Sequence, residues 1–150
     1  MNDHDYYMSI ALQLAQQARA DSETPVGCIV VDNNGAVIGR GRNRREKSKS
    51  ALAHAELEAI EDACNTLGDW RLSGCSLYVT LEPCPMCAGA VIMSRIDKLY
   101  FGARDELTGS CGSVINLFME KYGQSTQVVG GVLADECGDL LSGFFRSLRS

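Results

Sequence analysis

Two short motifs constrain this chain more than any other feature of its sequence. His54-Ala55-Glu56 stands at the start of one helical pattern, and Pro83-Cys84-Pro85-Met86-Cys87 stands at the start of another. A spacing of three places the sulfurs of Cys84 and Cys87 on one face of a helix start, within reach of a single ion. His54 supplies a third ligand, which leaves a fourth position for water, as in catalytic zinc sites. A fold that forms this triad has to bring the two helix starts together.

Glu56 is the candidate general base of such a site. A glutamate two residues after His54, at a helix start, is long enough to reach a water on the metal. Two thiolates cancel the charge of Zn²⁺, so this ion is expected to acidify its water less than a three-histidine site would. A base is then needed, and Glu56 is available.

Each of these residues also has a simpler interpretation. A lone C-x-x-C in an α/β protein is also typical of a redox pair. A single histidine on a helix is more often packed or exposed than a metal ligand. A glutamate in the first turn is favoured by the helix dipole alone. The metal interpretation is preferred because the motifs occur together and because the other histidine, His4, is expected in a frayed terminus.

Length and composition indicate a single domain spanning residues 1–150, large enough for one hydrophobic core. The first residues lack the basic start and apolar run of a secretory signal, and no apolar run is long enough for a membrane span. We therefore expect a cytoplasmic protein with no membrane partner. Seven cysteines, an odd number, favour thiols and metal ligands over a disulfide framework. Five of them are expected to be core or loop residues: Cys28, Cys64, Cys75, Cys111 and Cys137.

The charge is distributed unevenly along the chain. The net charge is −5, yet Arg40 to Lys49 holds six basic residues and one acid, Glu46. Such a run is either a solvated loop or a surface that attracts a polyanion. Its position just before His54 favours the second interpretation.

Hydrophobic periodicity and turn residues predict an α/β fold. Strands and helices alternate in the second half of the chain, which implies parallel strands with helices packed on the sheet, and an opening hairpin makes the sheet mixed. The predicted result is a three-layer α/β/α domain with about five strands in an order that the sequence leaves open. The expected helices are 7–20, 53–67, 84–94, 113–121 and 135–149, and the expected strands are 27–32, 36–39, 76–81, 98–102 and 127–133.

Beyond the metal motifs, the chain resembles the TadA-type tRNA adenosine deaminases of the cytidine deaminase superfamily over nearly its whole length. H-x-E followed by P-C-x-x-C is shared by the superfamily. Narrower matches to the TadA branch are Leu77 to Ala90, Phe101-Gly102-Ala103-Arg104-Asp105 and Phe144-Phe145-Arg146. The chain departs from the family pattern at Leu107, where a lysine is common, and at Gln124-Ser125-Thr126, where Asn-His is common.

The resemblance implies a zinc-dependent hydrolytic enzyme that converts adenosine to inosine at the wobble position of a tRNA anticodon. It implies one Zn²⁺ per chain on His54, Cys84 and Cys87, proton transfer by Glu56, and a homodimer that binds a tRNA anticodon stem-loop. It also implies substrate contacts from Asn43, Asp105, Phe145 and Arg146.

Two other functions remain open at this point. One is the same chemistry on a free base or nucleoside such as guanine, cytosine or cytidine, which would need neither the basic run nor the Phe-Phe-Arg ending. The other is a non-catalytic zinc module, which would have no use for a carboxylate at Glu56.

Overall fold

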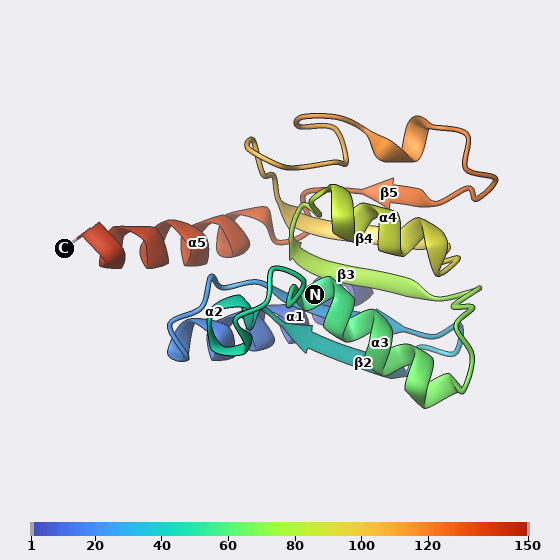
Figure 1. Ribbon diagram of the computed structural model, residues 1–150, viewed down its shortest axis with the longest axis horizontal. Coiled ribbons are helices and arrows are strands. Elements are labelled where there is room, and N and C mark those ends of the chain that lie inside the picture. The colour runs from blue at the N-terminus through green and yellow to red at the C-terminus, as the bar shows by residue number, and fades with distance from the viewer. Residues whose placement is uncertain (1, 150) are drawn as a thin grey trace.

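The computed structural model describes residues 2–149 and places a five-stranded mixed sheet at the centre of the protein (Figure 1). The elements, in chain order, are α1 (Asp3–Ala20), β1 (Gly27–Val31), β2 (Val37–Arg42), α2 (Arg45–Ser48), α3 (Ala55–Leu67), β3 (Ser76–Leu81), α4 (Pro85–Met93), β4 (Lys98–Ala103), η1 (Leu117–Met119), β5 (Gln127–Val129) and α5 (Ala134–Arg149). None of the helices in residues 2–149 has the length and apolarity needed to cross a membrane.

The strand order is β2-β1-β3-β4-β5, which the sequence left open. β1 pairs antiparallel with both β2 and β3, whereas β3, β4 and β5 are parallel to one another. The predicted mixed sheet and the parallel second half are thus confirmed. Because β2 and β3 flank β1, α3 crosses over β1 on its way from one to the other.

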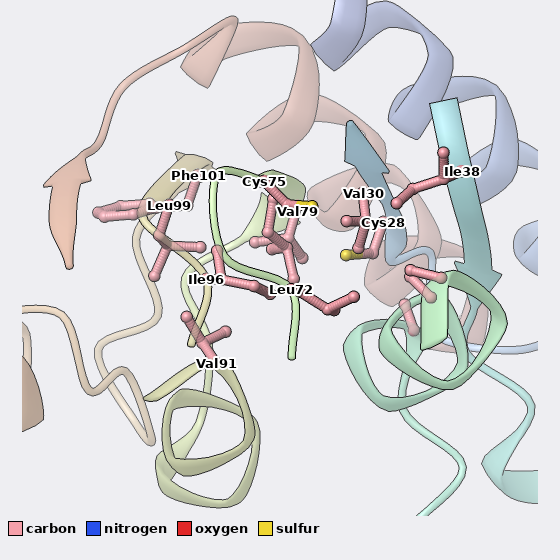
Figure 2. Packing of buried hydrophobic residues seen from close by; sticks show 14 of the residues in the cluster. Cys28, Val30, Ile38, Leu72, Cys75, Val79, Val91, Ile96, Leu99 and Phe101 are labelled. Atoms are coloured by element: carbon pink, nitrogen blue, oxygen red, sulfur yellow. The ribbon is translucent and has the colours of Figure 1, made fainter. Parts of the chain in front are cut away.

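Helices cover both faces of the sheet and enclose two apolar cores. Cys28 and Val30 of β1 face α3 and α4, where they pack in a cluster that also includes Val91 and Phe101 (Figure 2). Ile29, between them in the strand, points to the opposite face, where α1 and α5 pack. This alternation follows from the two-residue period of a strand. β1 is buried on both faces, and the three-layer prediction is confirmed.

Close packing of α3 on β2 fixes where α3 begins. A Cβ on Gly41 would collide with the backbone of Ala55, and one on Gly39 would collide with the backbone of Ala59. The absence of side chains at these two positions lets the helix lie directly on the strand. His54 precedes α3 as its N-cap residue, so this contact sets the position of the first motif.

Several predicted elements differ from the structure in type or length. β2 continues to Arg42, past the predicted end at Gly39, because Gly27 of β1 still pairs with Arg42. Residues 113–121 form no α-helix but a loop with one 3-10 turn, because the backbone folds back on itself through bonds such as Leu117 N–H to Ser110 O, at 3.0 Å. The last strand ends at Val129 instead of Leu133, since Gly131 and Leu133 adopt positive φ angles of 88° and 51°.

The first helix begins earlier than predicted, and His4 is not frayed. Asn2 caps the helix by accepting a hydrogen bond from the Asp5 N–H at 2.8 Å. The His4 ring stacks on Tyr100, and its Nδ1 lies 2.7 Å from the Tyr78 hydroxyl. His4 is therefore part of an aromatic cluster on the α1 face of the sheet.

Candidate metal centre and active-site cleft

His54, Cys84 and Cys87 converge at the adjacent starts of α3 and α4. His54 and Cys84 are the N-cap residues of these helices, and Cys87 lies in the first turn of α4. Their ligand atoms all lie within 4.8 Å of one another. His54 Nδ1 is 3.7 Å from Cys84 Sγ and 3.5 Å from Cys87 Sγ. The structure therefore brings the predicted triad together.

These distances fit a tetrahedral zinc ion. Zn–S bonds of about 2.3 Å and Zn–N bonds of about 2.0–2.1 Å at a tetrahedral angle separate sulfur from nitrogen by about 3.6 Å. The two Sγ–Nδ1 distances lie on either side of that value. The ligand atoms thus already have the spacing that one ion requires.

The electrostatics of the triad also suit a cation. The hydrogen bond from Cys87 lowers the pKa of the Cys84 thiol to about 4, with a second contribution from His54. The pKa of His54 is raised, chiefly by its hydrogen bond to Cys84. The pKa of Cys87 is raised by its interaction with the Cys84 sulfur and by burial. One sulfur is therefore a thiolate at neutral pH even before a metal binds, and soft thiolate ligands favour Zn²⁺.

Glu56 lies beside the triad in the first turn of α3 and is only 4% exposed. Burial raises the pKa of its carboxyl to about 7, and the negative charge of the Cys84 thiolate acts in the same direction. A cation at the triad would oppose both effects and keep Glu56 ionised. A buried carboxyl and a thiolate facing the same space are a second indication that a cation belongs there.

The five other cysteines lie in the core or at its edge. Cys28, Cys75, Cys111 and Cys137 are buried, and Cys64 is half-buried. Within residues 2–149, none of them joins a group with metal-ligand spacing. These positions agree with the expectation of core or loop residues.

A cleft of about 460 Å³ opens over the triad. His54, Glu56 and Cys84 form its floor. The remaining lining residues come from the turn after α1, the residue after β2 together with α2, the first residue of α3, the end of β3 with Glu82, the segment after β4, and α5. They include Thr24, Val26, Asn43, Arg45, Arg104, Asp105, Glu106, Leu107, Thr108, Leu141 and Phe145.

Three of the four expected substrate contacts line this cleft: Asn43, Asp105 and Phe145. Arg146 does not, and it is exposed on α5 beside them. Phe145 is 45% exposed, whereas its neighbour Phe144 is 6% exposed and packs against the domain. Of this pair, Phe144 is therefore a core residue, and Phe145 is the one that lines the cleft.

Asn43 and Asp105 are both held by local hydrogen bonds. Asn43 Oδ1 accepts the backbone N–H of Arg45 at 2.9 Å, so its amide nitrogen is the end left to face the cleft. The Asp105 carboxylate accepts bonds from the Leu107 N–H and from the Thr108 N–H and hydroxyl. Leu107 is 87% exposed at the mouth of the cleft.

The sequence prediction missed two buried glutamates that hold the cleft walls. Glu82 is 1% exposed and accepts backbone N–H groups of Asp105, Cys111 and Ser113, together with the Ser113 hydroxyl. Glu23 is 2% exposed and accepts the backbone N–H groups at the start of α2. Their signal in the sequence is weak, since each stands next to an apolar strand and is read as a charged turn residue.

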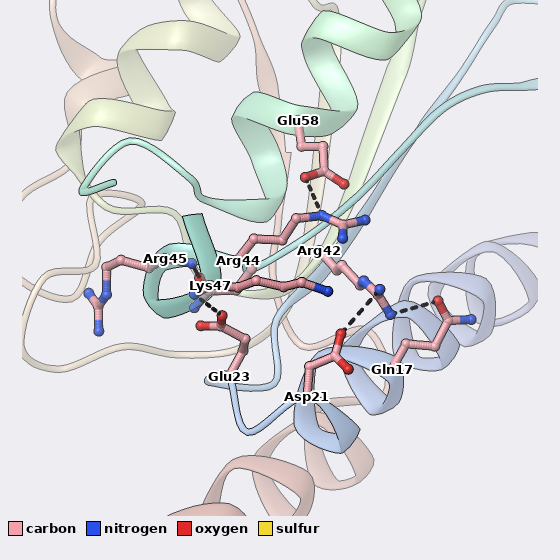
Figure 3. A network of polar contacts seen from close by, with 9 residues as sticks. Gln17, Asp21, Glu23, Arg42, Arg44, Arg45, Lys47 and Glu58 are labelled. Atoms are coloured by element: carbon pink, nitrogen blue, oxygen red, sulfur yellow. Dashed lines mark hydrogen bonds and ion pairs between the residues drawn. The ribbon is translucent and has the colours of Figure 1, made fainter. Parts of the chain in front are cut away.

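The basic run is not the loop that one interpretation assumed. Arg40 and Arg42 belong to β2, and Arg42 pairs with Asp21 at 3.2 Å. Arg44 pairs with Glu58 at 2.8 Å (Figure 3). The remaining three bases, Arg45, Lys47 and Lys49, are exposed and make no ion pair within residues 2–149. Arg40 is also exposed and without an ion pair in that range, but it lies beside Glu58, Glu61 and Asp62, so the positive charge nearest the cleft comes from α2 and the residue that follows it.

Comparisons with known proteins give consistent results. The family profile described as "Cytidine and deoxycytidylate deaminase zinc-binding region" matches residues 1–103. The tRNA-specific adenosine deaminase of Bacillus subtilis (strain 168) is 48% identical over 150 residues, which covers 99% of this chain and 92% of that protein.

Two solved structures are also similar. One comes from work on A-to-I editing by tRNA:A34 deaminases at the wobble position of transfer RNA. It has a TM-score of 0.86 at 39% identity and covers 91% of this chain and 99% of that chain. The other, a guanine deaminase from Nitrosomonas europaea, has a TM-score of 0.83 at 27% identity and covers 93% of this chain and 83% of that chain.

Proposed function

The chain belongs to the cytidine and deoxycytidylate deaminase family, and from this we infer that it is a tRNA adenosine deaminase that makes inosine at the wobble position. The observation that carries the inference is the cleft itself. A zinc-spaced His/Cys/Cys triad and the buried carboxyl of Glu56 lie at its floor, and unpaired cations lie at its rim. Relatives with tRNA-specific names, similar over almost the whole chain, support the choice of substrate.

His54, Cys84 and Cys87 would hold one Zn²⁺ per chain. The ion would supply Lewis acidity that lowers the pKa of a water molecule. Support for this assignment comes from the Sγ–Nδ1 distances and from the thiolate character of Cys84. The zinc-binding description of the matching family profile agrees with it.

Glu56 would act as the proton carrier. In hydrolytic deamination, water adds to C6 of adenine, N1 gains a proton, and the amino group leaves as ammonia. Glu56 accepts the proton of the attacking water and delivers it to N1, and it then carries the hydroxyl proton of the tetrahedral adduct at C6 to the departing amino group. Its burial at the cleft floor keeps bulk water from competing for that proton.

The cleft walls would bind the target nucleotide and its neighbours. Asn43 presents an amide N–H to the base, and Asp105 lies where a neighbouring ribose hydroxyl can approach. Phe145 offers an exposed ring for base stacking, and Arg146 lies beside it for a phosphate. Arg45, at the opposite wall, adds positive charge.

Guanine deamination is the second candidate, because a guanine deaminase that is 27% identical in sequence shares this fold with a TM-score of 0.83. A free base would leave Phe145 and the cations of α2 without a role. The tRNA substrate uses both, which is why we prefer it.

We further propose that residues 1–150 form one zinc-dependent deaminase domain that acts as a homodimer in the cytoplasm. Sedimentation analysis of the zinc-loaded protein tests the dimer: a species of twice the chain mass is expected, and a monomer at micromolar concentration contradicts it.

A side-by-side assay tests the substrate. An anticodon stem-loop with adenosine at the wobble position is compared with free adenosine, cytidine and guanine at equal concentrations, and the products are separated by chromatography. Inosine should form in the stem-loop far faster than any free compound reacts, since the flanking nucleotides position the base for reaction. Faster turnover of guanine or a nucleoside would replace the tRNA assignment with that of a metabolic deaminase.

A further inference from the structure

Glu23 is a buried charge with an unusual set of partners. It lies in the turn between α1 and β1 and is 2% exposed. One carboxylate oxygen accepts the backbone N–H of Glu46 at 3.0 Å, and the other accepts that of Lys47 at 2.8 Å. Glu23 thus binds the backbone of α2 through residues 23 and 24 positions further along the chain (Figure 3).

These bonds complete the N-terminus of α2. The residue before the helix, Arg44, provides no side-chain cap. Asn43 binds the Arg45 N–H, and Glu23 binds the next two N–H groups. A helix of four residues is too short to be stable alone. The carboxylate of Glu23 therefore supplies two of the three side-chain bonds that hold the start of α2 in place, and Asn43 supplies the third.

The segment that Glu23 holds carries the cations of the cleft rim. Arg45 lines the cleft, and Lys47 and Lys49 are exposed. Asn43, which lines the same wall, is bonded to the first N–H of α2. If the cap is lost, α2 can unwind, and these groups lose their fixed positions relative to Glu56 on the floor.

We propose that Glu23 is a positioning residue for RNA binding: its buried carboxylate caps α2 from a distant segment and so orders Asn43 and Arg45 at the cleft rim. The inference rests on the proposed tRNA function for the identity of the ligand. Glu23 belongs neither to the metal triad nor to the residues that line the cleft. It acts on binding of the stem-loop, and the chemical step at the floor is independent of it.

The direction in which RNA affinity changes on substitution of Glu23 distinguishes a cap from a simple negative charge near the RNA. Glu23 carries a negative charge close to a surface that binds a polyanion, so removing that charge should by itself strengthen RNA binding. Removing the cap should weaken RNA binding, because α2 then has to be ordered again when RNA binds. The two explanations of the residue predict opposite results for one substitution.

The test compares Glu23→Gln with Glu46→Gln in the zinc-loaded protein, using the anticodon stem-loop. Glu46 is exposed on α2 itself, so its variant removes the same charge without removing the cap. Glu23→Gln should raise KM about tenfold, because the amide offers one acceptor for two N–H groups and the backbone of α2 loses order. Its kcat should stay within about twofold of the parent value, and the KM of Glu46→Gln should fall or stay unchanged.

Two further measurements separate positioning from general damage. Hydrogen exchange should accelerate at the Glu46 and Lys47 amides of Glu23→Gln, with no change in the exchange of α3. In a double-mutant cycle, Arg45→Ala should cost less RNA affinity in the Glu23→Gln background than in the parent. If Glu23→Gln loses zinc or unfolds, Glu23→Asp replaces it, since it keeps the charge and withdraws the oxygens from α2.

The proposal would be overturned if the KM of Glu23→Gln were equal to or below that of the parent. Additive effects of Glu23→Gln and Arg45→Ala on RNA affinity would also overturn it, and so would an equal fall in kcat and kcat/KM. Failure of the proposed function gives a different result. In that case the parent protein makes no inosine in the stem-loop, while accelerated exchange at Glu46 and Lys47 would still report the loss of the cap.

Discussion

The floor and the rim of the cleft are held in place by different forces. His54, Glu56, Cys84 and Cys87 lie at the starts of α3 and α4, whose positions are set by apolar packing on the sheet. Apart from α5, the rim consists of short segments, α2 and the residues after β4, whose backbone N–H groups are bound by the buried carboxylates of Glu23 and Glu82.

This difference indicates that the floor and the rim of the cleft have separate roles. Packing of α3 and α4 on the sheet fixes the proposed reacting groups, whereas polar caps fix segments that carry the proposed substrate contacts. Substitutions at the floor should therefore act on metal content and kcat, and substitutions at the rim should act mainly on RNA binding.

The largest effect is expected for Cys87→Ser, at the floor. Loss of one thiolate from a three-ligand set should remove most of the zinc and, with it, nearly all activity. Metal analysis of the purified variant checks this. Cys64→Ser is the control, because Cys64 is half-buried on α3 and lies outside the triad. Full zinc content in Cys87→Ser would refute the ligand assignment.

Glu56→Gln should keep zinc and the fold but lose turnover. The amide preserves the shape of the side chain and cannot accept a proton. General acid–base groups typically contribute ~10²–10⁴-fold, and Glu56 serves both halves of the reaction, so the loss of kcat should lie at or beyond the upper end. Glu61→Gln, an exposed carboxyl on the same helix, should be active. Near-normal turnover in Glu56→Gln would mean that another group is the base.

The same division explains what could be predicted from the sequence. The floor depends on local signals: His54 and Cys84 are N-cap residues, Pro85 is the first residue of α4, and a spacing of three places Cys84 and Cys87 together. Such signals lie in neighbouring residues, so the triad and the elements around it could be predicted from the sequence.

The rim depends on contacts between distant residues, which leave no periodic pattern. Glu23 binds α2 and Glu82 binds the segment after β4, and neither partnership follows from neighbouring residues. For the same reason, residues 113–121 were wrongly predicted as helix: their apolar residues have helical spacing, yet Glu82 and the backbone of Gly109 and Ser110 bind their N–H groups. Strand order also depends on distant pairing, and the sequence did not determine it.

Gly109→Ala tests the wall that Glu82 holds. A Cβ at this position would collide with the Glu82 carboxylate, which would have to release some of its N–H partners. Because a displacement of about 1 Å near a site can cost ~10²-fold, kcat/KM for the stem-loop should fall roughly ten- to a hundredfold. Gly138→Ala on α5, where the added methyl meets nothing, is the matched control and should be fully active. Parent-like kinetics in both variants would show that the Glu82 bonds do not position this wall.

The adjacent phenylalanines of α5 should separate RNA binding from stability. Phe145→Ala should weaken stem-loop binding by ~1–3 kcal/mol, the value of one base–aromatic stack, and leave thermal stability nearly unchanged. Phe144→Ala should destabilise the fold by ~3–5 kcal/mol, since this ring is 6% exposed. Binding by the inactive Glu56→Gln protein and a melting curve measure the two effects. Equal losses of stability in both variants would mean that Phe145 is a core residue and not part of the RNA-binding surface.

The smallest effect is expected for the cations of the basic run, and it distinguishes two neighbouring arginines. Arg45 is exposed, unpaired and at the cleft, so Arg45→Ala should reduce the slope of log affinity against log salt concentration by about 1. Arg44 already pairs with Glu58, so Arg44→Ala should cost only ~0.2–1 kcal/mol of stability and leave the slope nearly unchanged. Stem-loop binding at a series of salt concentrations measures both slopes. A slope for Arg45→Ala equal to that of the parent would mean that Arg45 makes no phosphate contact, and the phosphate contacts would then fall to other cations such as Arg104 and Arg146.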